Sequence, residues 1–405
     1  MARPRPASER DFEALSELVE LVGSGRATSR GELARATGVA ASTITHRVGL
    51  LVEHGLLAES GNGESRGGRR PALLSLNAQA GVILSADIGA TLSRFAVTDL
   101  GADVLAETKA AMDVNEGPER LLGLAVDSFR QLLAGLGRPP SDVRAIGVGV
   151  PGPVEPGSGR VVRPQMMAGW DGCLVPDHFR DFPGVPVVAG NDANLMALGE
   201  YRARGRAHDH LLFVKVSTGI GCGIVSHGTI HSGTNSAAGD IGHVRLAGYD
   251  HVHCACGNTG CVMAVASGGA IAHALREQGL PTRNSFDVAE LVAAGNIEAR
   301  QAVRAAAREV GEVVATMVSF YNPGCIVLGG MFALLSEDLL TDIRSVVYGR
   351  ALSLATHTLQ IELSRLGERA GTVGGAVMAS QYLLSPAGLG NVLAGEPWVP
   401  SRLAP

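Results

Sequence analysis

Apolar residues in the first part of the chain recur at the spacing of short amphipathic helices. The segment "DFEALSELVELVGSG" places them on one helical stripe, and "TSRGELARATGV" predicts a second helix. Ser29 can cap this second helix, Glu32 follows at the spacing of a capping box, and Gly38 ends it. The stripe of the first helix consists of Phe12, Leu15, Leu18, Val19 and Val22.

The next segment, "AASTITHRVGLLVEHGLL", predicts a third helix with an apolar inner side. That side is formed by Ile44, Val48, Leu51 and Val52. Two short helices joined by a glycine-bearing turn match the helix-turn-helix pattern, whose second helix enters the major groove of DNA. We expect the residues on or near the outer face of the predicted third helix to contact DNA; they are Ser42, Thr43, Thr45, His46 and Arg47.

Two short strands around a polar, glycine-rich tip are predicted in "LLAESGNGESRGGRRPALLSL", the pattern of a wing. Arg66, Arg69 and Arg70 on this tip suit contacts with phosphate or the minor groove. Residues 1–75 hold ten arginines and nine acidic residues, whereas the rest of the chain has a net charge of −6. A domain that only docks another protein also fits the helices, but the local positive charge favours a DNA-binding domain over residues 1–77.

From residue 80 onward, apolar runs and amphipathic segments alternate as in an α/β protein. "GVILSADIGATLSRFAVTDL" predicts two strands around a glycine turn, and "LLFVKVSTGIGCGIVSHGTI" repeats the pattern. This repeat predicts a duplicated body with a cleft between a small lobe, residues 80–190, and a large lobe, residues 191–385. A tail over residues 386–405 is rich in glycine and proline, and we expect it to pack loosely.

Three glycine-rich turns at strand ends are candidates for phosphate and nucleotide binding. In the first, "DIGAT", backbone N–H groups and a hydroxyl can meet phosphate oxygens while Asp87 holds Mg²⁺. One such turn is a weak signal, but three in this order across about 240 residues indicate an actin-like sugar kinase architecture. The residues predicted to bind a nucleotide, if that ability is retained, are Asp87, Gly89, Thr91, Thr218, Gly219, Gly221, Gly329 and Gly330.

The segment "GNDANLMALGE" follows an apolar strand and carries a candidate general base. Asp192 can face the cleft there and take the proton of a sugar hydroxyl as it attacks a γ-phosphate. Asn191 and Asp192 can also cap the helix that follows. The two roles are compatible.

Three of the six cysteines crowd into "HCACGNTGC", where Gly257 and Gly260 let the loop fold back. One imidazole and three thiolates are the donor set of a closed, structural Zn²⁺ site. His251 and His253 are competing candidates, disfavoured by crowding beside the cysteines, and a cluster of free thiols is the alternative. The predicted ligands, with spacing H-x10-C-x-C-x4-C, are His243, Cys254, Cys256 and Cys261.

Together these motifs resemble the ROK family of bacterial sugar kinases and sugar-responsive transcriptional repressors. "GDIGHVRL…CACGNTGC" looks like the family signature with its zinc motif, and "VPGPVEPGSGRVVRPQMMAGW" and "GNDAN" look like its sugar-site segments. The resemblance implies an N-terminal winged helix-turn-helix followed by a two-lobed, actin-like (ribonuclease H-like) α/β body. In this family the repressors carry such a head and the kinases lack it. The resemblance also implies that Asn191, Asp192, Asp240 and His243 contact sugar hydroxyls and that zinc orients the loop carrying His243.

Several positions depart from the kinase pattern of the family. Met263 stands where the kinases carry Glu, Asp240 where they usually have Glu, and Gln165 where they have Asn. Ala90 adds a methyl group to the phosphate turn. Loss of one carboxylate removes a charge-assisted hydrogen bond of about 1.5–3 kcal/mol. Together the departures point away from efficient phosphorylation of hexoses.

We therefore expect a sugar-responsive transcriptional regulator, a repressor released from operator DNA by a mono- or oligosaccharide. The alternative is an ATP-dependent sugar kinase with a regulatory head, for which Asp192 would be catalytic and Mg-ATP the cosubstrate. Symmetric half-sites on DNA predict a homodimer or homotetramer. The net charge of −5, the lack of a long apolar run and an N-terminus unlike a secretion signal predict a cytoplasmic protein without membrane contact.

Overall fold

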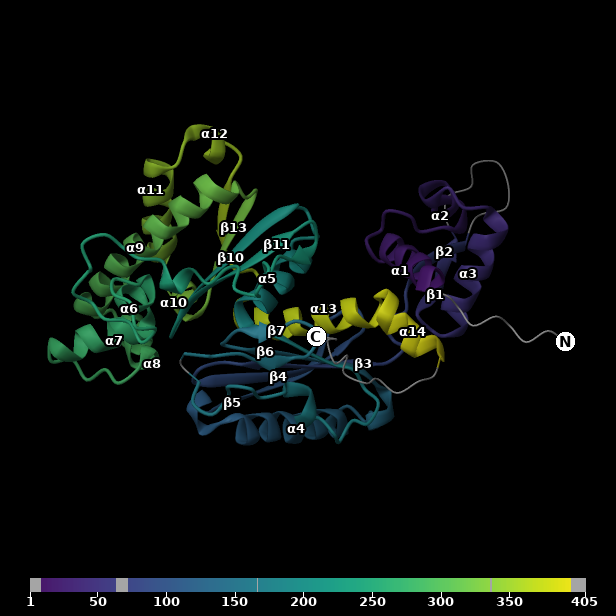
Figure 1. Cartoon of the computed structure of the whole chain (residues 1–405), viewed down its shortest axis with the longest axis horizontal. Helices are drawn as coiled ribbons and strands as arrows, with labels where there is room; N and C mark the ends of the chain where they lie inside the picture. Colours follow the sequence, from purple (N-terminus) through teal and green to yellow (C-terminus); the bar gives the residue numbers. More distant parts are fainter. Residues whose placement is uncertain (1–8, 63–71, 166, 336, 395–405) are drawn as a thin grey trace.

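A helical head lies at one end of a larger, two-lobed α/β body (Figure 1). The computed structural model describes residues 9–62, 72–165, 167–335 and 337–394. Within these ranges, no helix combines the length and apolar character that crossing a bilayer requires. The arginines predicted on the wing tip, Arg66, Arg69 and Arg70, lie outside the described residues.

The head has the helix and strand order of a winged helix-turn-helix. Ser29 Oγ accepts the N–H of Glu32 at 3.3 Å, and the Glu32 carboxylate accepts the N–H of Thr28 at 2.8 Å, so the predicted cap forms. Gly38 ends the second helix in the left-handed conformation, with φ 70°. The elements are α1 (Glu9–Gly23), α2 (Arg30–Thr37), α3 (Ala41–Glu53) and the antiparallel pair β1 (Leu57–Asn62) and β2 (Ala72–Leu76).

The small lobe is built on a five-stranded sheet of order β5-β4-β3-β6-β9. All residues of its central strand β3 are buried, as expected for a strand covered on both faces. Helix α4 (Pro118–Gly135) packs on one face, where Phe129 meets Phe95 edge to face. The strands are β3 (Val82–Ile88), β4 (Leu92–Asp99), β5 (Val104–Ala111), β6 (Val143–Val150) and β9 (Val187–Asn191), with a short hairpin of β7 (Val154–Glu155) and β8 (Arg160–Val161).

The large lobe repeats this sheet with the order β12-β11-β10-β13-β14. In both sheets the first two pairings are antiparallel and the last two are parallel, which confirms the predicted duplication. The strands are β10 (His210–Val216), β11 (Ile220–Ser226), β12 (Thr229–Ile230), β13 (Cys325–Gly329) and β14 (Gln360–Leu363). The helices added to this sheet are α6 (Val262–Ala266), α7 (Gly268–Glu277), α8 (Ser285–Ala293), α9 (Ile297–Tyr321), α10 (Met331–Leu335), α11 (Glu337–Arg350) and α12 (Ser353–Thr356).

Two helices, α5 (Asp192–Ala203) and α13 (Ala370–Leu383), pack against each other and join the lobes. Their backbones touch at glycines, because a Cβ on Gly374 would lie 1.6 Å from the carbonyl oxygen of Leu195. Helix α13 also packs on β3 and β6, so this segment, assigned to the large lobe from the sequence, rests on the small-lobe sheet.

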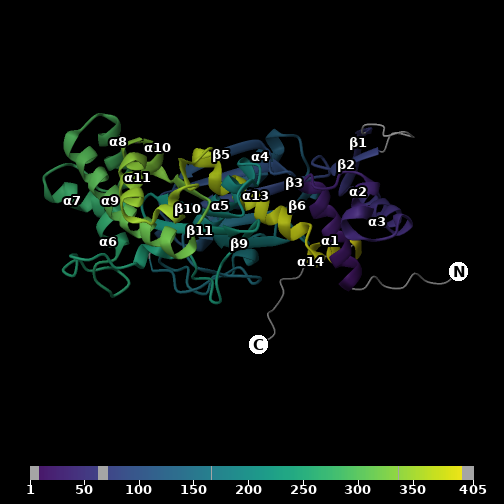
Figure 2. The ribbon, with the colours of Figure 1, turned by 90° about the horizontal axis from the view of Figure 1, so that it is seen from above.

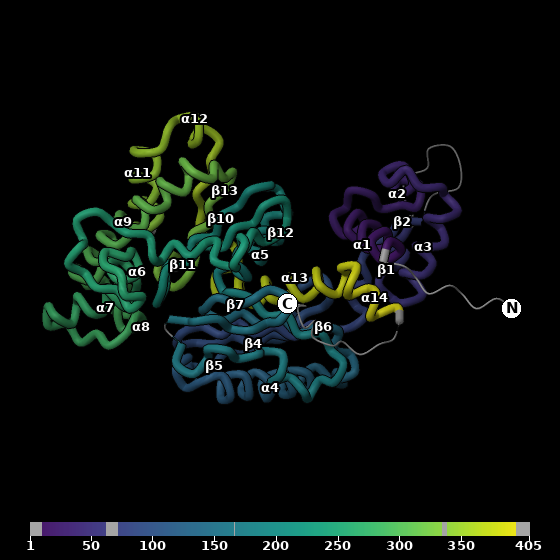
Figure 3. Tube along the Cα trace, viewed as in Figure 1, coloured from purple at the N-terminus to yellow at the C-terminus, as the bar shows by residue number. Residues whose placement is uncertain are grey.

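After α13 the chain continues into α14 (Pro386–Ala394) beside the head, as Figures 2 and 3 show. Leu389 of α14 is fully buried in the head's hydrophobic core, together with Leu15 and Val48. The Ser16 hydroxyl donates to the carbonyl of Leu384 at 2.8 Å. This differs from the loose packing expected of the tail: residues 386–394 complete the core of a domain that begins about 370 positions earlier.

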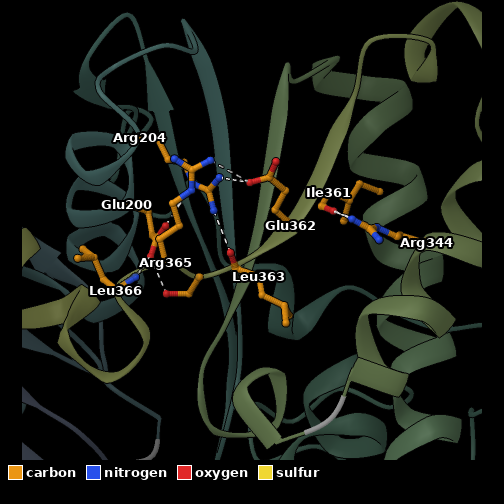
Figure 4. A network of polar contacts seen from close by, with 9 residues as sticks. Glu200, Arg204, Arg344, Ile361, Glu362, Leu363, Arg365 and Leu366 are labelled. Atoms are coloured by element: carbon orange, nitrogen blue, oxygen red, sulfur yellow. Dashed lines mark hydrogen bonds and ion pairs between the residues drawn. The ribbon is translucent and has the colours of Figure 1, made fainter.

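A buried ionic network fixes the outer edge of the large lobe (Figure 4). Arg204, just after α5, bonds Glu200 at 3.2 Å, the carbonyl of Leu363 at 2.9 Å, and Glu362. Glu200 in turn accepts the N–H of Leu366 at 2.8 Å. The network therefore ties α5 to β14 and to the loop that leads into α13.

Candidate functional site

The predicted metal ligands converge in the loop between β12 and α6. One ligand atom from each of His243, Cys254, Cys256 and Cys261 lies within 4.8 Å of all the others. Gly257 and Gly260 adopt φ of 89° and 73°, values that let the loop fold back on itself. The competing candidates, His251 and His253, are not in this cluster. Such a group of an imidazole and three thiols could hold a metal ion.

His243 faces both the cysteine cluster and the cleft. Its Nδ1 lies 3.6 Å from the sulfur of Cys254, and its Nε2 lies 4.0 Å from a carboxylate oxygen of Asp240. The backbone N–H of Asn258 holds the pKa of Cys256 down at about 6, which favours the thiolate that binds metals. The two roles that the sequence left open for His243 are therefore compatible in geometry.

A cavity of about 320 Å³ opens between the two lobes beside this loop. All four residues expected to contact sugar line it, namely Asn191, Asp192, Asp240 and His243. Asn115 and Arg163 from the small lobe also line it, and the sequence reading missed both. Polar side chains from both lobes line it together with apolar ones, and they offer hydrogen-bond donors and acceptors of the kind that bind hydroxyls.

Asn191 and Asp192 sit where strand β9 passes into helix α5. The side chain of Asn191 caps this helix by accepting the N–H groups of Ala193 and Asn194 at 3.0 and 3.3 Å. Asp192 Oδ1 accepts the N–H of Ala193 at 2.7 Å, and the residue is only 3% exposed. The helix cap thus holds both side chains at the floor of the cavity.

Lys215 of β10 forms an ion pair with Asp192 that the sequence reading did not foresee. Its ammonium donates to Asp192 Oδ2, and both side chains are largely buried. Burial alone would lower the pKa of Lys215, but the adjacent Asp192 carboxylate outweighs it and the pKa is raised. The signal was present in "LLFVKVS", a buried strand interrupted by one of the two lysines in the chain.

Asp87, at the end of β3, lies close to this pair but below the cavity surface. Its Oδ1 is buried and has no hydrogen-bond partner among the described residues. Burial, and then the charge of Asp192, raises the pKa of Asp87 to about 7. The cleft thus holds two carboxylates and one ammonium in a poorly solvated place.

The residues predicted to bind a nucleotide divide into two groups. Thr91, Thr218, Gly219 and Gly221 line the cavity, whereas Asp87, Gly89, Gly329 and Gly330 do not. Gly329 has a packing reason of its own, because a Cβ there would lie 2.1 Å from the ring of Phe213. The hydroxyl of Thr218 is already bonded to that of Ser285 at 2.8 Å. Four of the eight predicted residues thus lie at the cavity, and the other four lie outside its lining.

The outer face of α3 is open, as a recognition helix requires. Ser42, Thr43, Thr45 and His46 are exposed, and Arg47 is half-buried, while Ile44, Val48 and Leu51 are buried beneath them. Thr45 directs its hydroxyl back to the carbonyl of Ala41 at 2.8 Å.

Comparisons with known proteins extend over most of the chain. The model of the ROK family matches residues 83–382. A protein of Caldicellulosiruptor sp. (strain Rt8B.4) named putative xylose repressor is 29% identical over 374 residues, which cover 89% of this chain and 93% of that protein.

Two solved structures have similar folds. The crystal structure of a ROK family transcriptional regulator, described as a homolog of the E. coli MLC protein, gives a TM-score of 0.79 at 23% identity and covers 96% of this chain and 100% of that one. A ROK family glucokinase from Streptomyces griseus, in complex with glucose and AMPPNP, gives a TM-score of 0.63 at 27% identity and covers 74% of this chain and 100% of that one.

Proposed function

The chain belongs to the ROK family, and from that premise we propose that it is a transcriptional repressor that a sugar releases from operator DNA. The observation that carries the proposal is the union of two parts in one chain. Helix α3 presents an open polar face, and the body holds a cavity between its lobes that carboxylate, amide and imidazole side chains line. The xylose repressor relative matches across both parts, whereas the glucokinase covers 74% of this chain.

The sugar is held by Asn191, Asp192, Asp240 and His243 in this proposal. Carboxylate and amide groups fixed by a helix cap can accept and donate hydrogen bonds to neighbouring hydroxyls. Xylose is the first sugar to test, because it appears in the name of a relative. The cavity volume of about 320 Å³ also leaves room for a larger saccharide.

We assign Zn²⁺ to the cluster of His243, Cys254, Cys256 and Cys261. Three thiolates and one imidazole match its preferred tetrahedral donor set. A bound ion would fix the loop, and with it the ring of His243, against the cavity.

The release of DNA follows from coupling between cleft and head. Closure of the lobes on a sugar would move α13, which rests on the small-lobe sheet and leads directly into α14. Because α14 supplies Leu389 to the head's core, the head would move with it. In a homodimer or homotetramer two heads read half-sites about 34 Å apart, so a shift of a few Å weakens binding. A sugar that prefers one state about a hundredfold provides roughly 2.7 kcal/mol for this change.

The alternative function is that of an ATP-dependent sugar kinase. Two observations support it: the body resembles the glucokinase, and Asp192 lines the cavity. A coupled assay with Mg-ATP and a sugar panel separates the two functions. Turnover above about 1 s⁻¹ that Asp192→Asn abolishes would establish the kinase.

The decisive experiment is a gel shift with duplex DNA from upstream of the protein's own gene, titrated with xylose and a panel of other mono- and oligosaccharides. We expect binding at nanomolar protein, on the order of 10⁻⁸ M, and release by one sugar. Arg47→Ala should cost about 1–3 kcal/mol at one operator position, whereas Arg180→Ala on the exposed surface of the body should cost nothing. If the protein binds no duplex DNA, with or without sugar, the proposal is overturned. A repressor acts where its operator DNA lies, so the proposal also assigns the protein to the cytoplasm.

A further inference from the structure

Lys215 occupies a place in the sheet that is cleared for its side chain. It is the second-to-last residue of β10, where its partners are Gly221 in β11 and Gly329 in β13. Neither neighbour has a side chain, so the lysine can extend along the strand ends toward the cleft. Its side chain is 14% exposed and reaches the 5% exposed carboxylate of Asp192.

The second carboxylate comes from the small lobe. A Cβ on Gly149 would lie 3.5 Å from Asp87 Oδ1 and 3.7 Å from the Cα of Asp192, so the Asp87 carboxylate and the backbone of Asp192 both lie beside this glycine. The charge of Asp192 acts on Asp87, and two buried carboxylates that interact in this way repel each other unless a cation or a proton offsets one charge. In a nucleotide site that cation is Mg²⁺, which the sequence placed on Asp87.

We propose that Lys215 is the fixed counter-ion of this cleft, taking the part of the divalent cation, so that the cleft binds its sugar without metal or nucleotide. The ammonium bonds one carboxylate directly and lies near enough to the other to act on its charge. Unlike Mg²⁺, it is covalently part of the large lobe and cannot arrive or leave with a phosphate.

The hydrogen bonds of Asp192 agree with this role. Its Oδ1 accepts a backbone N–H and its Oδ2 accepts the ammonium. A carboxylate has further lone pairs, so it can still hold a sugar hydroxyl. Its negative charge, however, is already offset by a fixed cation, and it is therefore suited to bind a hydroxyl more than to remove its proton.

An independent contact in the glycine turn points the same way. The backbone N–H of Ile220, within the second of the predicted phosphate turns, donates to the sulfur of Met263 at 3.3 Å. The same side chain lies against Gly219 and Gly242, where a Cβ would meet it at 3.4 and 2.6 Å. Lys215 thus supplies the cation that Mg²⁺ would bring to the carboxylates. The sulfur of Met263 supplies the hydrogen-bond acceptor that a phosphate would bring to the turn.

This inference rests on the proposed function only in taking a sugar as the ligand. Its test needs neither sugar nor DNA, so it can fail while the repressor function stands, and the reverse. The probes are Mn²⁺, followed by electron paramagnetic resonance, and AMPPNP with Mg²⁺, followed by calorimetry, on the full zinc-loaded chain.

Lys215→Met should gain a Mn²⁺ site, because it leaves the two carboxylates without a cation, with affinity at least about tenfold above the wild type. Lys109→Met, at the only other lysine and on the exposed strand β5, is the matched control and should gain nothing. Asp192→Asn combined with Lys215→Met should lose the new site. Lys215→Arg keeps the charge and should bind no Mn²⁺.

Two results would overturn the inference. One is a folded Lys215→Met protein, judged by circular dichroism, whose Mn²⁺ affinity equals that of the wild type. The other needs no variant: wild-type protein that binds Mg-AMPPNP with Kd below roughly 0.1 mM, about −5.5 kcal/mol, has an open nucleotide site. If Lys215→Met does not fold, the wild-type titration and Lys215→Arg decide the question alone.

Discussion

The two lobes have the same sheet but opposite charges at corresponding positions. Asp87 is the second-to-last residue of β3, and Lys215 is the second-to-last residue of β10. Each lies in the middle strand of its sheet and is paired in parallel with a glycine, Gly149 or Gly329. The small lobe therefore brings an acid to the cleft where the large lobe brings a base.

This difference shows what a duplicated fold leaves free to vary. Strand order and direction depend on backbone pairing and on apolar faces, which are alike in the two halves. Side chains at the ends of the strands face the cleft, where they meet the other lobe instead of their own core. The chemistry of the cleft thus comes from the positions at which the two lobes differ.

The largest effect should come from removing the charge of the large lobe. Lys215→Met should lower the free energy of unfolding by about 3–5 kcal/mol, because it leaves Asp192 buried without its partner. Urea denaturation measures this. The double variant Asp192→Asn, Lys215→Met should recover part of the loss, since the pair then disappears together. If the loss of stability in the double variant equals the sum of the losses in the two single variants, the two side chains do not interact.

The large lobe also differs in carrying the cluster of His243 and three cysteines, and Cys256→Ser tests the metal site proposed there. The variant loses one thiolate of four donors, so we expect its Zn²⁺ affinity to fall at least tenfold. Metal content after dialysis against a chelator measures this. Cys173→Ser in the small lobe, a free cysteine outside the cluster, should keep the metal. Unchanged zinc in Cys256→Ser would remove Cys256 from the ligand set.

The paired glycines allow a direct comparison of the two sheets. Gly329→Ala should destabilise the protein by about 1–3 kcal/mol, because its Cβ would overlap the rigid ring of Phe213. Gly149→Ala meets the end of the Leu195 side chain at 2.8 Å, which can turn aside, so we expect a cost below about 1 kcal/mol. Thermal or urea unfolding of both variants gives the order, and the reverse order would contradict the packing seen at Phe213.

The last prediction concerns Asp87, the acid of the small lobe, and its effect depends on pH. The pKa of Asp87 is raised to about 7 in the folded protein, above its ordinary value of 3.8. Between these values the folded state binds the extra proton, so wild-type stability falls as pH rises from about 4 to 7. Asp87→Asn removes this penalty and should raise the Tm at pH 8, with a smaller gain at pH 5. Asp127→Asn, an exposed acid on α4, should show no such trend. A gain that does not change with pH would mean that Asp87 is ionised throughout.

Local patterns in the sequence predicted the head and the cluster of His243 and three cysteines well. The cap at Ser29, the break at Gly38 and the burial of Ile44 and Val48 depend on residues a few positions apart. The cysteines that converge with His243 likewise lie within one loop. At such short range the covalent spacing nearly fixes the geometry.

The features that the sequence reading missed join distant segments. Lys215 and Asp192 lie on different elements, and no spacing rule links a strand lysine to a helix cap. The glycines and proline of the segment "PAGLGNVLA" predict loose packing, but the segment forms a helix that packs against α1 and α13. Tertiary contacts decide such elements, and local propensity does not record them.

The place of Leu389 in the head's core has a consequence for synthesis. The helices and strands of the head are synthesised first, but Leu389 of its core is added more than 300 residues later. At about 5–20 residues per second, this delay lasts on the order of tens of seconds. Nascent chains, and fragments ended by a premature stop codon, therefore carry a head whose core is incomplete, so the DNA binding proposed for the head would begin only when the chain is finished.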